Sequence, residues 1–353
     1  MRLGICAFPL SRGKETGRGL ERLIDEFCAY LTTQHVDFEL HDRGVIRSEL
    51  RAIFESAAFM AALARARDSC YFAVYAVAAV FPALAGKRPL VSVITDLIPF
   101  HVSGYDNALK FAVKRWCARI ACAASDLVIV GSGSIRDEIV SRFRLDPGKV
   151  LVIPWGVDHE TYHPSPNVAR QRGRVAFLGE IKRAKGIDTL IVAFRRVIDE
   201  VPEATLAIGG SGRDLEEMKR LAASTLPARS FSFEGFIPEG KMNAFYNSAD
   251  LFVFPSRYGF GLSALEAMAC GTPTLVGNSL DTKDFFFDEE LLVDPDDPAR
   301  MAARIVAVLA SEETKQRKAR EAVEFAAKFS WRAMGERYLA ACVRAASAEP
   351  IGS

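Results

Sequence analysis

The sequence predicts an α/β protein made of two doubly wound parallel-sheet domains, and three observations support this fold class. Short apolar runs alternate with helical patterns along the whole chain, as in parallel sheets with helices on both faces. The length of 353 residues allows two domains that each bury a core. The polar stretch 163–167 contains Pro164 and Pro166, which restrict helix and strand alike and indicate a linker. We therefore expect one domain over residues 1–165, a second over 166–325, and a C-terminal helix over 326–353.

The composition argues against several classes of protein. The 45 basic residues nearly balance the 44 acidic ones, so nothing indicates a nucleic-acid partner. The chain passes at once into a strand, which leaves no room for a signal peptide. The most apolar run, 71–86, is too short and too interrupted by Pro82 to indicate a membrane span. The seven cysteines include no Cys-x-x-Cys pair, which favours reduced core residues of a cytoplasmic protein.

The N-terminal half is expected to begin with a strand at Leu3–Phe8, a glycine-bearing loop at Gly13–Gly19 and a helix from Leu20. Such a loop is weak evidence of phosphate binding, because many similar loops only turn the chain. The later elements expected in this half are a helix over 47–67, a strand over 90–95, a helix over 108–124, a strand over 127–130, a helix capped by Ser132 or Ser134, and a closing run over 150–158.

The expected helix 108–124 has a broad basic side with Trp116 near it. Its basic residues are Lys110, Lys114, Arg115 and Arg119. A helix of this kind can lie on an anionic membrane surface. The simpler interpretation is a solvated helix face, and the sequence leaves both open.

The C-terminal half shows the same alternation of strands and helices. Its expected elements are a strand over 175–178 with a loop to Gly186, a strand over 206–208 with a glycine turn to Gly212, a strand over 231–235, a strand over 252–254, a run over 285–295 and a helix over 331–343. Three aspartates at 294, 296 and 297 suggest an acidic turn more than a metal site.

The segment 252–273 organises the chain, and it indicates a strand, a glycine-bearing turn and a helix that ends at Gly271. Gly259 and Gly261 allow the backbone to approach a ligand closely. The helix that starts near Ser263 offers free N–H groups and a dipole to an anion. Glu266 lies one turn later, so a phosphate and hydroxyl groups could both be bound, as in a nucleotide sugar. The alternative is an ordinary strand–turn–helix unit whose glycines serve only the turn.

This segment resembles the donor-site signature of the retaining glycosyltransferases of family 4, which reads Pro-Ser-x-x-Glu-Gly-Phe-Gly-Leu-x-x-x-Glu-Ala-Met-Ala-x-Gly-x-Pro. The resemblance continues over the whole chain and is strongest from 175 to 295. It implies the B-type fold, in which two Rossmann-like domains face a central cleft and the C-terminal helix crosses back to the first domain. The second Glu of the signature is Glu266. The first is absent, either deleted or replaced by Tyr258.

The resemblance also assigns roles to residues by their match to family motifs. Lys185 and Asp96 are the nominated catalytic residues, with Lys185 holding the donor diphosphate. Gly17, Gly19 and Arg22 correspond to an acceptor or phosphate loop that faces the cleft. The donor-binding residues implied are Arg183, Gly212, Ile237, Tyr258, Gly259, Phe260, Gly261, Leu262, Ser263 and Glu266.

Three positions depart from the family pattern. Thr95 stands where relatives often have His, Glu180 stands where they have Arg, and the Glu before Gly259 is lost. His101 could compensate for the missing His, although a lone loop His is usually just solvated. The departures allow two explanations, a working enzyme with a changed donor sugar or a catalytically silent relative that binds a partner or acts as a scaffold. A nucleotide-sugar epimerase or phosphorylase on the same fold is a third.

The resemblance favours a metal-independent hexosyltransferase without a cofactor, using a nucleotide-sugar donor. By analogy the acceptor is a glycan or glycolipid in the synthesis of cell-surface polysaccharide or lipopolysaccharide. The location implied is the cytoplasm, with peripheral contact at the inner face of the membrane as an open alternative. We expect a deep cleft in which the 261–263 helix end faces the 13–19 loop. At least two of Arg183, Lys185 and Arg257 should point into it, with Glu180 paired or turned away.

Overall fold

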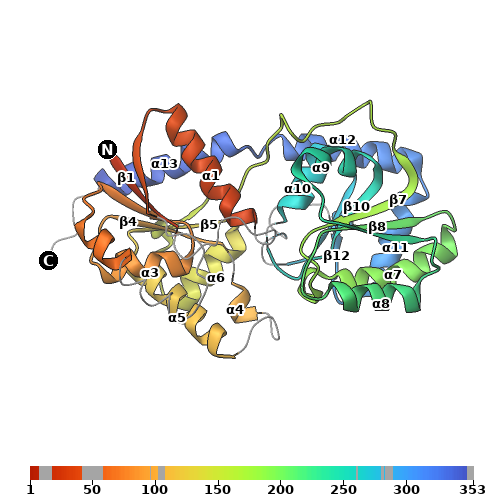
Figure 1. Ribbon diagram of the computed structural model, residues 1–353, viewed down its shortest axis with the longest axis horizontal. Coiled ribbons are helices and arrows are strands. Elements are labelled where there is room, and N and C mark those ends of the chain that lie inside the picture. The colour runs from red at the N-terminus through yellow and green to blue at the C-terminus, as the bar shows by residue number, and fades with distance from the viewer. Residues whose placement is uncertain are drawn as a thin grey trace. The chain divides into compact units, whose positions relative to one another are not determined.

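The computed structural model describes residues 1–7, 18–41, 59–95, 97–101, 108–259, 261–279, 282 and 289–347. The chain divides into two compact units. One comprises Met1–Trp155 together with Trp331–Ser353, and the other comprises Gly156–Ser330. Each is a parallel sheet with helices packed on it (Figure 1).

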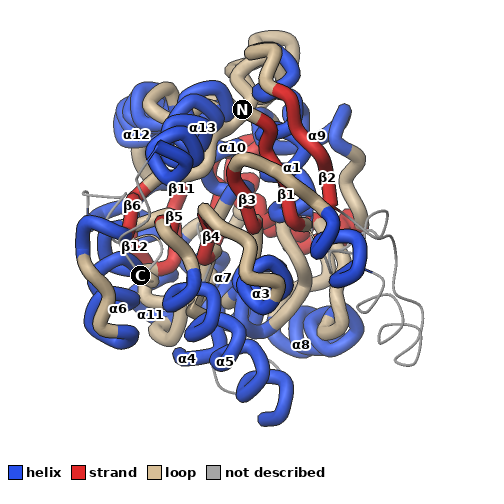
Figure 2. The backbone as a smooth tube through the Cα atoms, turned by 90° about the vertical axis from the view of Figure 1, so that its left-hand side faces the viewer, coloured by secondary structure: helices blue, strands red, loops and turns tan. Residues whose placement is uncertain are grey.

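The N-terminal unit contains a six-stranded sheet in the order β2-β1-β3-β4-β5-β6, and every neighbouring pair is parallel. Figure 2 shows these strands following one another across the unit. The inner strands β3, β4 and β5 are buried at every position, as expected for a sheet covered on both faces. The strands are β1 (Arg2–Cys6), β2 (Asp37–His41), β3 (Cys70–Ala73), β4 (Leu90–Ile94), β5 (Leu127–Val130) and β6 (Val150–Val152).

Helices α1 and α13 lie on one face of this sheet, and α3 and α5 lie on the other (Figures 1 and 2). Ser132 caps α6 by accepting a hydrogen bond from the Ile135 N–H at 3.2 Å, which confirms one of the two expected caps. The helices are α1 (Arg18–Thr33), α3 (Ala76–Leu84), α4 (Ile98–His101), α5 (Ala108–Ala124), α6 (Gly133–Phe143) and α13 (Trp331–Ser347).

The C-terminal helix α13 packs against α1 in the N-terminal unit. The Tyr338 ring lies 5.5 Å from Phe27 and 5.3 Å from Phe72. Gly335 allows this close approach, because a Cβ there would lie 2.5 Å from the Tyr30 ring. The chain therefore starts and ends in the same unit.

The C-terminal unit contains a second six-stranded parallel sheet, in the order β12-β11-β10-β7-β8-β9. Counted along the chain, this is the strand order 3-2-1-4-5-6 read from β9, the order of dinucleotide-binding folds. The strands are β7 (Gln171–Leu178), β8 (Thr205–Gly209), β9 (Phe231–Gly235), β10 (Ala249–Phe254), β11 (Thr274–Gly277) and β12 (Leu292–Val293). The helices are α7 (Ile187–Glu200), α8 (Leu215–Thr225), α9 (Glu239–Asn247), α10 (Leu262–Ala269), α11 (Pro298–Leu309) and α12 (Glu312–Ala326).

The boundary between the units lies at 155/156, before the expected position at 165/166. The reason is that the linker residues pack into the C-terminal unit. Tyr162 is fully buried there, with its ring 6.0 Å from that of Tyr246. Ser165 donates its N–H to the Asn247 side chain at 2.8 Å. The stretch with two prolines is therefore an ordered edge of the second core.

A buried ion pair attaches α12 to β10. Asp250 accepts hydrogen bonds from Lys315 Nζ at 3.2 Å and from the Gly173 N–H at 2.8 Å. Burial alone would lower the pKa of Lys315, but the hydrogen bonds that its ammonium donates to Glu312 and Asp250 outweigh burial and raise that pKa. Because both side chains are at least nine-tenths buried, removing one partner would cost about 3–5 kcal/mol.

All seven cysteines are free thiols, and all but Cys28 are buried. Burial raises the pKa of Cys122 to about 12 and raises that of Cys6 further. Such thiols stay protonated and unreactive at neutral pH. No described helix is both long and apolar enough to cross a bilayer.

Candidate functional site

The candidate site lies at the carboxyl end of the C-terminal sheet, where β7 and β10 are neighbours. From β7 the chain moves toward β8 and β9, whereas from β10 it moves toward β11 and β12. Loops that leave in opposite directions open a crevice at such a switch point, which is where open parallel sheets bind ligands. The loops after β7 and β10 meet here, and the Arg257 N–H donates to the Ala184 carbonyl at 3.1 Å.

Two glycines make this meeting of loops possible. Gly186 has a φ of 72°, and a Cβ on it would lie 2.0 Å from the Pro255 carbonyl oxygen. Gly261 has a φ of 77° and precedes α10, where a Cβ would lie 3.1 Å from the Phe254 ring. Side chains at these positions would push the loops apart or strain the turn. The glycines of the signature therefore have a steric role in addition to any role with a ligand.

The N-terminus of α10 starts directly at this turn. The N–H groups of Ala264 and Leu265 both donate to the Gly261 carbonyl. The earlier N–H groups, those of Leu262 and Ser263, have no intrahelical acceptor by the geometry of a helix start. They carry the positive end of the helix dipole, which favours an anion.

Lys185 is brought to the same turn by the loop after β7. Its ammonium lies 4.2 Å from the centre of the Tyr258 ring and 5.5 Å from that of Phe254. It is also 3.5 Å from the position that a Cβ of Gly259 would take. Tyr258, next to the position where the family's Glu is lost, thus supplies an aromatic face to the cation. The structure brings Lys185, Tyr258, Gly259 and Gly261 together.

Glu266 lies in α10 and is 5% exposed. It accepts a hydrogen bond from the Tyr246 hydroxyl at 2.7 Å. Burial, together with the charge and hydrogen bond of Glu266, holds the pKa of Tyr246 well above its ordinary value. The phenol therefore remains a donor, and it fixes the orientation of the carboxylate. A carboxylate has room for more than one hydrogen bond, so this geometry is compatible with binding hydroxyl groups.

Gly212 and Ile237 follow β8 and β9 at the same edge of the sheet. A Cβ on Gly212 would lie 2.3 Å from the Ile181 carbonyl oxygen, and the Ile181 N–H donates to Ser211 at 2.9 Å. Ile237 lies beside Gly209 at the end of β8. These two predicted donor residues therefore flank the loop that carries Lys185.

Arg183 and Arg257 are engaged with carboxylates in the described structure. Arg183 forms ion pairs with Asp188 at 3.3 Å and Glu217 at 2.5 Å, and the bond to Glu217 raises its pKa. Arg257 pairs with Asp296 at 2.8 Å. Of the three cations expected beside the diphosphate, only Lys185 has described contacts with Tyr258 and Gly259.

Glu180 is paired, as expected, but with a residue that the sequence analysis missed. Lys182 Nζ lies 2.5 Å from the Glu180 carboxylate. Lys182 has an extended backbone, and residues two apart in an extended chain point to the same side. The two-residue separation of Glu180 and Lys182 was the feature of the sequence that could have predicted this ion pair. The pair reduces the negative charge that Glu180 would otherwise bring to the loop.

The other predicted site residues are in the N-terminal unit or in undescribed segments. Gly17, Asp96 and Phe260 lie outside the described residues. Arg22, four residues before Glu26 on α1, lies over the Trp331 ring at 5.8 Å. Gly19 lies in the first turn of that helix. His101 lies within 2.7 Å of Glu138, so its surface position has a structural partner.

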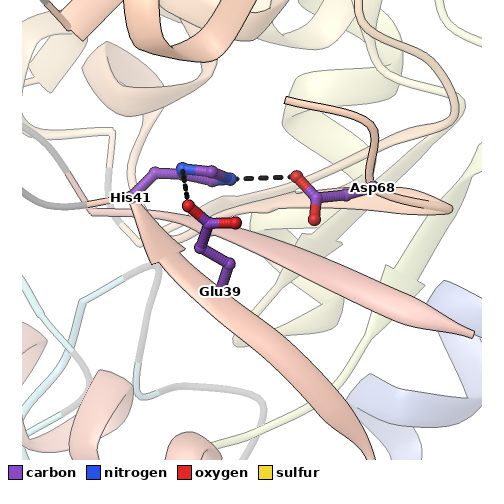
Figure 3. Close-up of side chains that lie close together, drawn as sticks. All are labelled: Glu39, His41 and Asp68. Carbon is purple, nitrogen blue, oxygen red and sulfur yellow. Dashed lines mark hydrogen bonds and ion pairs between the residues drawn. The ribbon is translucent and has the colours of Figure 1, made fainter. Parts of the chain in front are cut away.

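A charged cluster in the N-terminal unit was also missed by the sequence analysis. Glu39 and His41 come from β2 and Asp68 from the segment before β3 (Figure 3). His41 Nε2 lies 2.9 Å from the Asp68 carboxylate, and the ligand-type atoms of all three lie within 4.8 Å of one another. Among the described residues, this is the one group of three with metal-ligand geometry.

Arg2 offsets part of the negative charge of this cluster. Its guanidinium bonds to Glu39 and lies 3.4 Å from the Asp68 carboxylate. Gly4 provides the space, since a Cβ there would lie 2.6 Å from an Asp68 oxygen. The arrangement is therefore best described as an ion-pair network that ties β1, β2 and the start of β3 together.

Comparison with known proteins identifies two matched families. Residues 158–325 match the family described as "Glycosyl transferases group 1", and residues 17–161 match "Glycosyltransferase Family 4". The chain is 31% identical to the glycogen synthase of Mycobacterium tuberculosis over 252 residues, which are 68% of this chain and 59% of that protein. It is 28% identical to the D-inositol 3-phosphate glycosyltransferase of Corynebacterium jeikeium over 63% of this chain and 58% of that protein. The match thus spans little more than half of these curated relatives.

Solved structures agree over nearly the whole chain. Sucrose-phosphate synthase from Thermosynechococcus elongatus superposes with a TM-score of 0.83 at 20% identity, covering 98% of this chain and 100% of that one. Anabaena Alr3699/HepE in complex with UDP-glucose gives a TM-score of 0.77 at 18% identity, with 98% and 100% covered. At these identities the likeness establishes the fold.

Proposed function

We propose, because this chain belongs to the group 1, family 4 glycosyltransferases and has their B-type fold, that it transfers a sugar from a nucleotide-sugar donor with retention of configuration. One observation carries the proposal. Lys185, the glycine turn, the start of α10 and Glu266 converge at the switch point of a sheet with dinucleotide-binding order. This combination supplies charge for a diphosphate and an acceptor for ribose hydroxyls.

Lys185 and the α10 N-terminus would stabilise the diphosphate as it leaves. Charge develops on the phosphate oxygens when the sugar–oxygen bond breaks, so cations and dipoles fixed there lower the barrier. The Tyr258 and Phe254 rings hold the ammonium near the turn before the donor binds. Prior placement matters because no reorganisation is then needed during reaction.

Glu266 would bind the ribose of the nucleotide, with Tyr246 fixing its orientation. Gly212 and Ile237 would line the nucleobase side of the site. We favour a uridine nucleotide as the first donor to test, because Anabaena Alr3699/HepE is described in complex with UDP-glucose.

The reaction proposed needs no carboxylate nucleophile. The acceptor oxygen attacks the anomeric carbon from the face that the diphosphate leaves, and the leaving phosphate takes the acceptor proton. The new glycosidic bond forms as the sugar–phosphate bond breaks. Protein cations and dipoles serve where other transferases use a metal, so we propose metal independence. Asp96 remains a nominated catalytic residue outside the described residues.

The acceptor we propose is a glycan or glycolipid of a cell-surface polysaccharide pathway. The curated relatives include D-inositol 3-phosphate glycosyltransferase, mannosylfructose-phosphate synthase and glycogen synthase, so their names do not select one acceptor. A nucleotide-sugar donor and seven free thiols favour a cytoplasmic location.

A catalytically silent relative remains the second candidate because the chain departs from the family at three places: Thr95, Glu180 and the lost Glu before Gly259. Two observations favour the enzyme. The Glu180 charge is offset by Lys182, and the Tyr258 ring holds Lys185 at the turn. The changes are thus accommodated around an intact cation.

A thermal-shift screen with nucleoside diphosphates tests the proposal. Ligand at about 100 times its dissociation constant adds about 2.7 kcal/mol to the free energy of unfolding. We expect one nucleotide to stabilise the protein selectively, and the shift to shrink in Lys185→Ala. Stabilisation by none of the nucleotides would contradict the proposal and favour the catalytically silent relative. If a nucleotide does bind, turnover of the corresponding nucleotide sugar is measured as release of the nucleoside diphosphate.

A further inference from the structure

Helix α5 exposes an unusual amount of apolar surface. Leu109, Val113 and Trp116 are 74%, 50% and 55% exposed. Their spacing of four and three residues places all three side chains on one side of the helix. The buried side of α5 is formed by other residues, among them Phe111 and Cys122. The helix therefore has two apolar faces, one packed in the unit and one open.

The other exposed large apolar side chains among the described residues occur singly on their elements. Val192 on α7 and Val343 on α13 are 42% and 44% exposed. Scattered residues of this kind are normal on a soluble protein and need no partner. Three on one helix face form a patch, which usually marks an interaction surface.

Every charged residue of α5 is basic. The 17 residues of the helix contain four basic and no acidic side chains. At about 100° per residue, Lys110 lies on one side of the apolar stripe and Arg115 and Arg119 lie on the other. Arg115 is fixed in place, since its Nε donates to the Pro99 carbonyl at 2.6 Å. The stripe is therefore bordered by positive charge along both sides.

We propose that this face of α5 docks on an anionic lipid bilayer. Apolar side chains that include a Trp, with Lys or Arg at the borders, fit the two layers of a membrane surface, acyl chains below and anionic headgroups above. Lys and Arg stems can lie along the apolar region while their charges reach the headgroups. Because α5 is also packed on α3, the contact is a rigid surface in the folded unit.

The inference rests on α5 alone and is independent of the donor site. Docking through α5 would give the N-terminal unit a second role. It would hold the protein at the membrane surface, where the glycolipid acceptor proposed above would lie.

Co-sedimentation of the full chain with lipid vesicles tests the inference. One set contains phosphatidylcholine only, and the other contains about 30% phosphatidylglycerol as the anionic lipid. We expect binding to the anionic vesicles only, and loss of binding as salt rises from about 0.1 M to 1 M, where screening is strong. Equal binding to both sets, or binding to neither, would overturn the proposal.

Substitutions locate the contact. Lys110→Ala and Arg119→Ala should each weaken binding about fivefold, the expected contribution of one basic residue near an anionic surface. The double variant Leu109→Ser/Trp116→Ser should weaken it by at least about tenfold, because two apolar side chains no longer enter the bilayer. Val343→Ser, at a similarly exposed position on α13, is the matched control and should bind like the original protein. All these positions are exposed, so we expect each variant to keep the melting temperature of the original protein. That measurement checks that each variant is folded.

Fluorescence adds a readout that a merely structural effect would not change. Trp116→Phe should keep most of the vesicle binding and lose most of the quenching caused by brominated lipids. Unchanged quenching in that variant would place the contact elsewhere and overturn the proposal. The proposal would also be overturned if the protein were a dimer and Trp116→Ser converted it to a monomer, because the exposed face of α5 would then be a contact between two copies of the chain. Nucleotide stabilisation measured on the same samples shows whether the donor site is intact.

Discussion

The two units share one plan, a six-stranded parallel sheet with helices, but they use charge differently beside their first strands. In the N-terminal unit, Gly4 of β1 makes room for the buried carboxylate of Asp68, which His41 and Arg2 contact. In the C-terminal unit, Gly186 after β7 makes room for the backbone of Pro255, and Lys185 is held by aromatic rings.

The difference distinguishes a structural cluster from the candidate donor site. Opposite charges that meet within the fold stabilise strands and leave little field for a ligand. A cation held over aromatic faces gains a fixed position beside the glycine turn. A charged residue is therefore informative about function only when its partners are known.

The largest expected effect follows loss of the Lys185 cation. Lys185→Ala should reduce transfer by about 10²–10³-fold, the cost of removing one group that stabilises developing charge. Nucleoside diphosphate release from the preferred donor measures it. Lys219→Ala is the matched control, because Lys219 pairs with Glu216 on the exposed surface of α8. Equal turnover by the two variants would remove Lys185 from the mechanism.

Glu266→Gln should weaken nucleotide binding with a smaller effect on folding. A hydrogen bond to a charged group contributes roughly 1.5–3 kcal/mol, which is about ten- to a hundredfold in affinity. Gln keeps an oxygen that can accept from Tyr246, so the α9–α10 contact survives. Calorimetry gives the affinity, and an unchanged dissociation constant would make Glu266 a purely structural residue.

Asp68→Asn should lower stability without changing nucleotide affinity, which is the reverse of the result expected for Glu266→Gln. It weakens the bonds to His41 and Arg2 in a site that is almost fully buried, and a lost buried hydrogen bond costs about 1–3 kcal/mol. Chemical denaturation should therefore show lower stability, while nucleotide affinity stays the same. A change in affinity without loss of stability would make the Glu39–His41–Asp68 cluster part of a binding site.

Alkaline pH should affect the C-terminal unit through Tyr246 and Lys315. Their folded-state pKa values are raised, so the stability they contribute is complete below about pH 10, near their ordinary pKa values. It is lost as pH rises toward the folded-state values. Between pH 6 and 9 neither group changes charge. Thermal melts from pH 7 to 11 should be less pH-dependent in Tyr246→Phe, and an identical dependence would exclude Tyr246 as a contributor.

The sequence was sufficient for the fold and for the strand, turn and helix of the segment 252–273. Apolar periodicity located the strands because parallel strands are buried on both faces, and the signature 252–273 places the glycine turn and Glu266 correctly on β10 and α10. These are local features of the chain.

Contacts between distant segments were not predictable in the same way. Arg183 pairs with Glu217 of α8, and Asp68 pairs with His41 of β2. Packing sets how closely these distant segments approach one another. The boundary between the units lies earlier in the chain than predicted because Tyr162 packs into the core of the second unit. No local sequence pattern indicates that contact. The residue types indicated which segments could bind a charged ligand, but the ion-pair partner of each charged residue could be identified only from the structure.

Hydrogen exchange with and without a saturating nucleoside diphosphate tests whether the donor binds at the β7–β10 switch point. We predict that protection is strongest in the segments after β7 and β10, residues 179–186 and 255–266, and that Lys185→Ala reduces this protection. Protection of the Glu39–His41–Asp68 region in place of these segments, or no protection at 255–266 while the nucleotide is demonstrably bound, would contradict a donor site at the β7–β10 switch point.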